Sequence, residues 1–216
     1  MNSTESILSQ IEDTTDWIHD ILLDYERYEE PHSVPWTNSV YRSDTFRRAH
    51  IDVMTNKKLY MLHLCVFPNT NDPSPIFGFD LIAGEHKVTG AFHDFSPVKG
   101  DTNLDQYFQD ITKDLQWTKT RQLPDWAKRI FSPNMIAAGN IQDPAELETL
   151  LSIVRKNFLH YLAHVGTNTN NDYTEQQNSY CRNQKQNPHT PRVMKSLGFS
   201  DAIVDDFIEL CLFPEI

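Results

Sequence analysis

Glycine-rich phosphate-binding loops are absent from this 216-residue chain, which contains only 7 glycines. No G-x-G-x-x-G follows a strand-like segment, and neither a Walker A loop nor a G-x-S-x-G nucleophile elbow occurs. These absences exclude the usual signatures of dinucleotide-binding enzymes, P-loop NTPases and α/β-hydrolases. The sequence therefore gives no sign of a nucleotide or flavin cofactor of its own.

Cysteine is scarce as well. The three cysteines lie far apart, and no C-x-x-C pair or Cys/His metal-ligand spacing occurs. This pattern predicts neither a zinc site nor an iron–sulfur cluster, and dispersed thiols are typical of a reducing, cytoplasmic compartment. The sequence also contains no signal peptide and no apolar run of 18 residues, so we expect a soluble protein without a membrane partner.

Basic residues are fewer than acidic ones, with 19 Lys and Arg against 30 Asp and Glu. The formal net charge is −11 and the pI is about 5.2, which argues against nucleic acid as a partner. The composition is globular, with 39% hydrophobic and 11% aromatic residues, and the length suffices for one domain with a full core. We expect a single domain over residues 1–216 that is a monomer.

The N-terminal half of the chain predicts one helix followed by a block of strands. Residues 4–29 have an amphipathic pattern, with an apolar stripe formed by Ile7, Ile11, Ile18, Leu22 and Tyr25. Residues 31–44 contain two prolines and are predicted to be an irregular connection. Four consecutive strands are predicted between Arg47 and Asp94.

The C-terminal half is predicted to be mainly helical. Helices are expected over residues 103–120, 143–164 and 172–186, and two short helices end the chain. Residues 121–141 are expected to hold a short helix or strand that extends the edge of the sheet. This order of elements predicts a three-layer α/β/α sandwich, in which helices flank a central, mainly antiparallel sheet.

Two of the predicted strands place an ionisable side chain inside an apolar run. His63 is at the centre of residues 59–67, and Asp80 is in the middle of residues 76–82. An imidazole or carboxylate is costly to bury without a partner, while a strand buried on both faces normally reads as a continuous apolar run. These two positions therefore need a structural or a functional reason.

The expected turns bring more polar residues to the same sheet face. With turns at Asn56-Lys57 and Gly84-Glu85, and a loop from Pro68 to Pro75, strand alternation gathers five side chains. His63 is then opposite both Asp80 and His50, and Thr89 is opposite Asp80. Asp52 is diagonal to His63. A slip of one residue in any pairing would scatter this group.

The polar cluster has two interpretations. A buried His–Asp pair can be purely structural, because structural ion pairs also perturb pKa values. Four ionisable groups on one apolar face favour proton donation instead, since burial raises a carboxyl pKa and a neighbouring imidazole shares the proton. A cofactor-free hydrolase is a further alternative, but no positioned nucleophile accompanies the cluster.

Several separated motifs resemble the ferredoxin-dependent bilin reductases, most closely the phycocyanobilin:ferredoxin oxidoreductases and their phycoerythrobilin-forming relatives. The likeness extends from about Tyr41 to Ile216 and is carried by the segments PIFGFDLIAG, VTGAF-x-D-F-S-P, RQLPDW, YCRNQKQNPHTPRVM and a terminal LFP. The resemblance implies an α/β/α sandwich that reduces the tetrapyrrole biliverdin IXα to a phycobilin. It also implies that the enzyme holds no redox cofactor and receives single electrons from reduced [2Fe-2S] ferredoxin.

The resemblance assigns roles to residues of the cluster. The catalytic aspartate of the family corresponds to Asp80 and its catalytic histidine to His63. The family's H-L-E-L strand corresponds to residues 50–53, so that His50 is also implied in catalysis. Asp52 stands where phycocyanobilin formation uses a glutamate, and the following turn is one residue shorter.

Substrate-binding residues are implied in the same way. The hydroxyl that holds a propionate corresponds to Thr89, and the propionate-binding arginine corresponds to Arg121. The family's N-D-K-T becomes Asn187, Pro188, His189 and Thr190, so this chain lacks an acid and a lysine at the second propionate contact.

The resemblance leaves the product open between two phycobilins. Because Asp52 is one methylene shorter than glutamate, we predict a four-electron reduction to phycoerythrobilin through 15,16-dihydrobiliverdin, with phycocyanobilin as the alternative. A bilin carrier without turnover would need the propionate contacts but no buried proton donors. Docking of an acidic ferredoxin on this acidic chain would need a local basic patch, and the candidates are Lys113, Lys119, Lys128, Arg129, Arg182, Lys185, Arg192 and Lys195.

Overall fold

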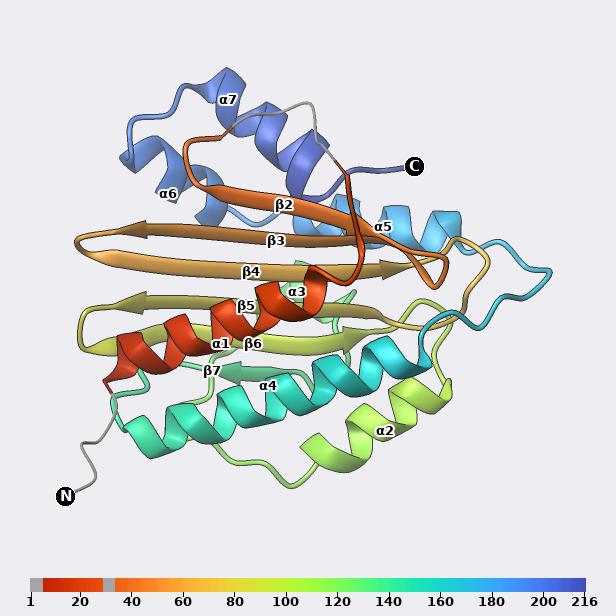
Figure 1. Ribbon diagram of the computed structural model, residues 1–216, viewed down its shortest axis with the longest axis horizontal. Helices are drawn as coiled ribbons and strands as arrows, with labels where there is room; N and C mark the ends of the chain where they lie inside the picture. The colour runs from red at the N-terminus through yellow and green to blue at the C-terminus, as the bar shows by residue number, and fades with distance from the viewer. Residues whose placement is uncertain (1–5, 29–33) are drawn as a thin grey trace.

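One antiparallel sheet, with its strands in chain order, runs through the computed structural model (Figure 1). The structure describes residues 6–28 and 34–216, so the ends of the helix predicted at 4–29 and the start of the connection predicted at 31–44 lie outside the described residues. The strands are β1 (Glu26–Tyr28), β2 (Thr37–Arg42), β3 (Phe46–Asn56), β4 (Leu59–Pro68), β5 (Ile76–Gly84), β6 (Lys87–Ser96) and β7 (Ile136–Ala138).

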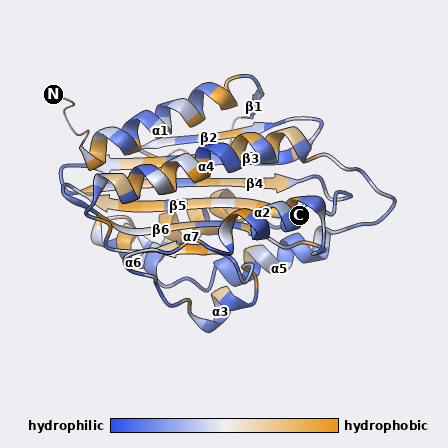
Figure 2. Ribbon diagram, turned by 90° about the horizontal axis from the view of Figure 1, so that it is seen from below, coloured by the Kyte–Doolittle hydropathy of each residue, from blue (hydrophilic) through white to orange (hydrophobic). Residues whose placement is uncertain are grey.

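Helices cover both faces of this sheet, which confirms the predicted α/β/α sandwich (Figures 1 and 2). The first layer consists of α1 (Ile7–Leu22), α2 (Asn103–Thr112) and α4 (Pro144–His164). The second layer consists of α3 (Asp125–Lys128), α5 (Thr174–Gln184), α6 (His189–Ser196), α7 (Asp201–Asp206) and a π-helix, η1 (Phe207–Leu212). The two layers pack against separate apolar clusters.

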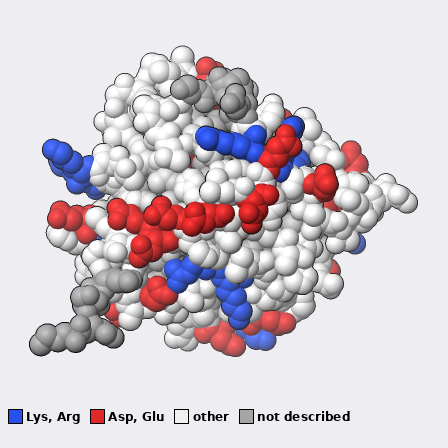
Figure 3. Space-filling model, viewed as in Figure 1, with Lys and Arg blue, Asp and Glu red and all other residues white. Residues whose placement is uncertain are grey.

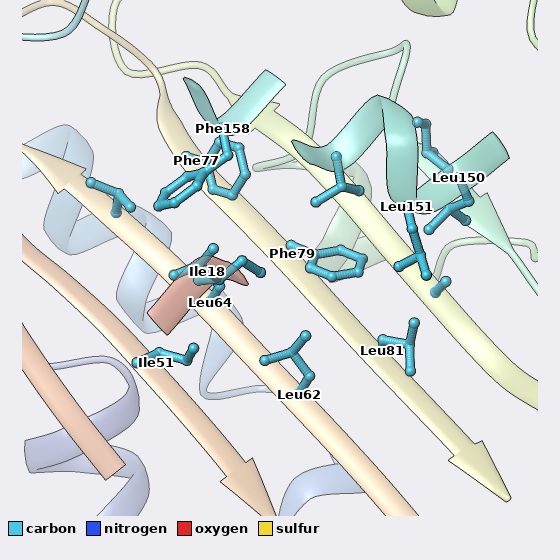
Figure 4. Close-up of a cluster of buried hydrophobic side chains, with 14 of the residues drawn as sticks. Ile18, Ile51, Leu62, Leu64, Phe77, Phe79, Leu81, Leu150, Leu151 and Phe158 are labelled. Carbon is cyan, nitrogen blue, oxygen red and sulfur yellow. The ribbon is translucent and has the colours of Figure 1, made fainter. Parts of the chain in front are cut away.

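The main core lies between the sheet and the first helical layer (Figure 4). Alternate residues of each central strand point into it, such as Leu62 and Leu64 of β4 and Phe79 of β5, and these side chains are at most 1% exposed. α1 and α4 contribute residues such as Ile18 and Phe158. Truncating one such side chain to alanine costs roughly 2–5 kcal/mol. The intervening strand residues face the second layer, where the polar cluster was predicted.

α4 begins and ends as its sequence indicates. The Asp143 side chain accepts a hydrogen bond from the Ala145 backbone N–H at 3.0 Å, and Pro144 occupies the first helical position. The predicted short helix and edge strand within residues 121–141 correspond to α3 and β7, and β7 pairs with β6. α2 is shorter than predicted and ends at Thr112 rather than at residue 120.

The segments on either side of the first loop differ from the prediction. α1 ends at Leu22, and residues 26–28 form β1 instead of continuing the helix. Residues 37–42 form β2 rather than an irregular connection, and β2 pairs with both β1 and β3. Pairing with β2 therefore overrides the helical pattern of residues 26–28, and pairing with β3 overrides the turn-like composition of residues 37–42.

The register also departs from the predicted one at two turns. The β3–β4 turn is Lys57-Lys58, which shifts the pairing by two residues and places Asp52, not His50, opposite His63. A shift of two leaves every side chain on its face. Between β5 and β6 the turn is Glu85-His86, not Gly84-Glu85, which also shifts the pairing by two residues, and a bulge near Ile82 adds one more, so Phe92, not Thr89, is opposite Asp80.

Candidate active site

The sheet face under the second helical layer is covered at one end and open at the other. Cys65, Phe67 and Ile76 are fully buried beneath the C-terminal helices. Further along β4 and β5, and on the adjacent β6, four residues are only half-buried, namely Met61, Asp80, Ile82 and Phe92. These four residues, which are neighbours in the β4–β5 and β5–β6 pairings, are called the open strip below. A ligand could reach the sheet here.

His63 and Asp80 form a hydrogen-bonded pair at the edge of the open strip. They are opposite each other in the β4–β5 pairing, as predicted, and His63 Nδ1 is 2.7 Å from Asp80 Oδ1. The Asp80 side chain is 43% exposed and that of His63 12%. Burial lowers the pKa of His63, but the Asp80 and Asp52 carboxylates outweigh it, and the net pKa is raised. The pair can therefore hold a proton next to an accessible carboxyl group.

Asp52 is the buried carboxyl of the cluster. It is opposite His63 on β3, and its Oδ1 accepts a hydrogen bond from the Trp36 indole N–H. Burial raises the pKa of Asp52 to about 7, although His63 and the Trp36 hydrogen bond act against this. Asp52 can therefore retain its proton near neutral pH, in contrast to an ordinary surface aspartate.

His50 lies deeper still and is completely buried. Its Nε2 is 2.5 Å from Asn38 Oδ1, and its ring centroid is 5.4 Å from that of His63. Burial lowers its pKa well below the usual value, and the neighbouring His63 and Arg48 lower it further. His50 is therefore a neutral imidazole at the end of a row that runs through His63 to Asp80.

Burial alone does not mark a functional histidine, as His93 on the opposite sheet face illustrates. Its Nδ1–H donates to the Gly78 carbonyl at 2.8 Å, and its Nε2 accepts from the Asn157 amide at 2.9 Å. Burial lowers the pKa of His93 to about 4. Both ring nitrogens have partners, so His93 is a satisfied core residue. His50 Nδ1 and His63 Nε2, by contrast, are buried and have no hydrogen-bond partner among the described residues.

Thr89 and Arg121 lie together beside the open strip. The bulge places Thr89 next to Ile82, whose carbonyl accepts a hydrogen bond from the Thr89 hydroxyl at 3.0 Å. The Arg121 guanidinium donates to the backbone carbonyl of Thr89. A Cβ atom at Gly139 would lie 2.7 Å from Arg121 Nε, so this glycine leaves room for the arginine side chain. The two predicted propionate ligands are thus adjacent.

Asn187, His189 and Thr190 lie at the junction of α5 and α6 and form a local arrangement. The His189 backbone N–H donates to Asn187 Oδ1 at 3.0 Å, and the His189 side chain is exposed. Within the described ranges no hydrogen bond joins this segment to His63, Asp80 or Arg121. The structure thus shows no hydrogen bond, among the described residues, between the predicted second propionate contact and Arg121 of the first.

The sequence prediction missed three residues that contact the cluster. Trp36 and Asn38 lie in the segment for which the sequence predicts an irregular connection, and Cys211 of η1 is 3.8 Å from His50 Nε2. Only a strand prediction for residues 37–42 could have placed Asn38 beside β3. Across residues 6–28 and 34–216, no three His, Cys, Asp or Glu side chains gather as a metal site would require. In the same part of the chain, no helix has the length and apolar character needed to cross a membrane.

Comparison with known proteins gives a consistent result. A phycocyanobilin:ferredoxin oxidoreductase from Gloeobacter violaceus is 29% identical over 189 residues, covering 82% of this chain and 72% of that protein. A protein of the same name from Synechococcus sp. is 31% identical over 189 residues, covering 82% of this chain and 74% of that protein.

Two solved structures extend the comparison. The structure of a protein named PcyX has a TM-score of 0.69 and 30% identity, and the match covers 95% of this chain and 99% of that one. Phytochromobilin synthase from tomato, solved in complex with biliverdin, also has a TM-score of 0.69 but only 18% identity, covering 93% of this chain and 82% of that one. The tomato enzyme therefore supports the fold alone.

The family profile spans nearly the whole chain. The profile described as ferredoxin-dependent bilin reductase matches residues 8–214, a range that contains the open strip, the His/Asp row and both predicted propionate ligands. This chain belongs to the ferredoxin-dependent bilin reductases and is a bilin oxidoreductase that uses ferredoxin as its electron donor.

Proposed function

We propose that this enzyme reduces biliverdin IXα to phycoerythrobilin by four electrons, through 15,16-dihydrobiliverdin. A bilin as substrate is supported by the family profile and by the names of the relatives. The observation that carries the product is the unequal exposure of two carboxyl groups. Asp80 is half-exposed on the open strip, whereas Asp52 is buried and held by Trp36.

The bilin is proposed to lie on the open strip, with a propionate at the neighbouring Arg121. A guanidinium and a carboxylate form a charge-assisted hydrogen bond, which would anchor one edge of the tetrapyrrole. This placement would put the conjugated system against Met61, Ile82 and Phe92 and next to the Asp80 carboxyl. Ferredoxin then supplies electrons one at a time to the bound bilin.

Asp80 is proposed to be the proton donor. Each double-bond reduction takes up two electrons from ferredoxin and two protons from the protein, so phycoerythrobilin requires four of each. An added electron raises the basicity of the tetrapyrrole, and the Asp80 carboxyl transfers its proton to carbon. His63, 2.7 Å away, returns a proton to Asp80 through Nδ1. The half-exposed Asp80 carboxyl is thereby reprotonated by His63.

The state of Asp52 favours phycoerythrobilin over phycocyanobilin. In the phycocyanobilin-forming relatives a glutamate at this position is implied in protonation of the D-ring vinyl group. Asp52 is one methylene shorter, is 6% exposed and is hydrogen-bonded to Trp36. Proton delivery requires hydrogen-bond reach of roughly 3 Å. We therefore expect the vinyl group to survive and reduction to proceed at the 15,16 bridge and then the A-ring.

Phycocyanobilin is the second candidate product. It is favoured by the names of the curated relatives, and by the raised pKa of Asp52, which keeps a proton available. A carrier without turnover is disfavoured because a carrier has no use for the His63–Asp80 pair on the open strip.

Anaerobic turnover of biliverdin with reduced ferredoxin, followed by chromatography against both product standards, tests the proposal. A dominant phycoerythrobilin peak is expected, and a dominant phycocyanobilin peak would refute the product assignment. The variant Asp52→Glu tests the cause, because D-ring reduction should first appear there. Asp13→Glu makes the same side-chain extension on the exposed surface of α1 and should leave the product unchanged.

A further inference from the structure

Two side chains next to or on β2 each bind one ionisable residue of β3. The Trp36 indole, just before β2, donates to Asp52, and Asn38 Oδ1 is 2.5 Å from His50 Nε2. Asn38 is opposite Asp52 in the pairing, so its amide reaches diagonally along the sheet to His50. The Asn38 contact has a chemical consequence that the Trp36 contact lacks, because an imidazole exists in two neutral tautomers.

The Asn38 contact selects one tautomer of His50. A carboxamide oxygen only accepts hydrogen bonds, so His50 Nε2 must carry the hydrogen and donate it. The second nitrogen, Nδ1, is then left with an unshared electron pair. Nδ1 is buried and has no hydrogen-bond partner among the described residues. His50 therefore presents an unused proton acceptor in the interior of the site.

η1 holds the Asn38 amide from the other side. Asn38 Nδ2 donates to Cys211 Sγ at 3.1 Å, and the thiol is also 3.5 Å from Asn38 Oδ1. The Arg48 guanidinium donates to the Cys211 carbonyl at 2.5 Å, which fixes η1 against β3. With Nδ2 directed to sulfur, the amide oxygen is left for His50. The residues that face His50 are thus Asn38, His63, Arg48 and Cys211.

We propose that Asn38 is a positioning residue for proton transfer, which keeps His50 in the Nε2–H tautomer so that Nδ1 remains a proton acceptor beside His63. When His63 carries two protons, its Nε2–H needs an acceptor, and Nε2 has none among the described residues. The His50 ring is 5.4 Å away, centroid to centroid, and in this tautomer it offers a lone pair rather than a second N–H. Charged His63 is the form that returns a proton to Asp80, so the inference rests on the proton route proposed above.

The tautomer can be read without substrate, by ¹⁵N NMR of the full-length, histidine-labelled protein. The protein has 9 histidines, and the His50 signals are identified by their loss in His50→Gln. In the wild type the hydrogen is expected on Nε2. Asn38→Ala should abolish this single-tautomer signature. It should also lower kcat for biliverdin consumption by about tenfold to a hundredfold, at or below the lower end of what general acid–base catalysis contributes.

Asn38→Asp provides the conservative rescue. A carboxylate also only accepts, so the Nε2–H tautomer should return and kcat should recover in part. Its negative charge favours protonated His50, so the acidic limb of the pH–rate profile should move to higher pH. Asn157→Ala is the matched control, because it removes the amide partner of His93 on the opposite sheet face. It should lower the Tm yet leave the His50 signals and kcat unchanged.

Three results would overturn the proposal: an unchanged His50 tautomer in Asn38→Ala, an unchanged kcat in that variant, or an Asn38→Asp variant that behaves like Asn38→Ala in both measurements. Thermal unfolding of each variant separates these results from loss of the fold. The outcome is distinguishable from failure of the proposed product, because the tautomer is measured without substrate and kcat is followed as biliverdin loss. A phycocyanobilin product would leave the role of Asn38 standing.

Discussion

Asp80 and Asp52 are the same residue type on neighbouring strands, yet their surroundings give them different chemistry. Asp80 is 43% exposed and hydrogen-bonded to an imidazole, so it combines access to a ligand with a route for its proton. Asp52 is buried, and its pKa of about 7 reflects mainly the cost of burying its charge. The surroundings of the two carboxyl groups, and not the residue type, thus make Asp80 the candidate proton donor and leave Asp52 as a buried acid.

Asp80→Asn should still bind biliverdin but stall its reduction. An amide is nearly isosteric with the carboxyl but cannot donate an acidic proton, so the rate of bilin reduction should fall by roughly 10²–10⁴-fold. Single-turnover absorption spectroscopy with reduced ferredoxin measures this rate. Asp94→Asn changes another carboxyl on this sheet, which binds Ser96 and Ser132 and should affect stability alone. Full turnover by the Asp80 variant would remove Asp80 from the mechanism.

Part of the site could be predicted at the level of single residues. An imidazole and a carboxyl inside apolar runs identify His63 and Asp80, because neither is stable there without a partner. Trp36 and Asn38 carry no such signal. An indole and an amide are unremarkable in a segment with turn-like composition, and their partners are known only when β2 is placed beside β3.

At the scale of elements, register decides which predictions hold. The β3–β4 turn was shifted by two residues, and the side chains kept their face because strand alternation has a period of two. The β5–β6 turn is shifted by two residues as well, and the bulge at Ile82 adds a single residue that no local pattern indicates, so Phe92 rather than Thr89 is opposite Asp80. α4 was predictable because Asp143 and Pro144 mark its start, whereas the end of α1 depends on the pairing of β1 with β2.

The edge formed by β6, β7 and the segment before α3 gives an element-scale prediction. Arg121→Ala should weaken biliverdin binding about tenfold to a hundredfold, since a charge-assisted hydrogen bond contributes about 1.5–3 kcal/mol. Gly139→Ala should act in the same direction, because its Cβ would lie 2.9 Å from Arg121 Cγ and displace the side chain. Fluorescence or absorbance titration gives the Kd. Lys119→Ala removes an equal charge nearby and should leave the Kd for biliverdin unchanged. An unchanged Kd in Arg121→Ala would refute the placement of a propionate at Arg121.

At the scale of the whole molecule, charge is distributed unevenly. Figure 3 shows a band of Asp and Glu side chains along α1, in the first helical layer, and its exposed residues include Glu12, Asp16 and Asp20. An acidic ferredoxin is therefore repelled from this face. Five of the eight predicted docking cations are already in ion pairs, namely Lys113, Lys128, Arg182, Lys185 and Lys195. For Lys119, Arg129 and Arg192 the structure shows no ion pair among the described residues.

Arg129 is the best placed of these three cations. It follows α3 in the second layer, and hydrogen bonds to the Asn183 and Gln186 side chains of the α5 region hold its guanidinium in place. A fixed charge without an ion-pair partner among the described residues, on the layer that covers the site, suits an acidic partner that must pass electrons to the bilin in its proposed place on the open strip. Such a contact affects association more than chemistry.

Arg129→Glu should raise the KM for ferredoxin at low ionic strength, by about tenfold, while kcat at saturating ferredoxin stays the same. The difference should shrink as salt is added, because exposed charges are screened beyond about 10 Å at 0.1 M. Lys156→Glu changes the net charge equally but lies on α4 in the first layer, so its KM should remain close to that of the wild type. An equal rise in both variants would mean that net charge alone governs the encounter, and Arg129 would then have no special place in docking.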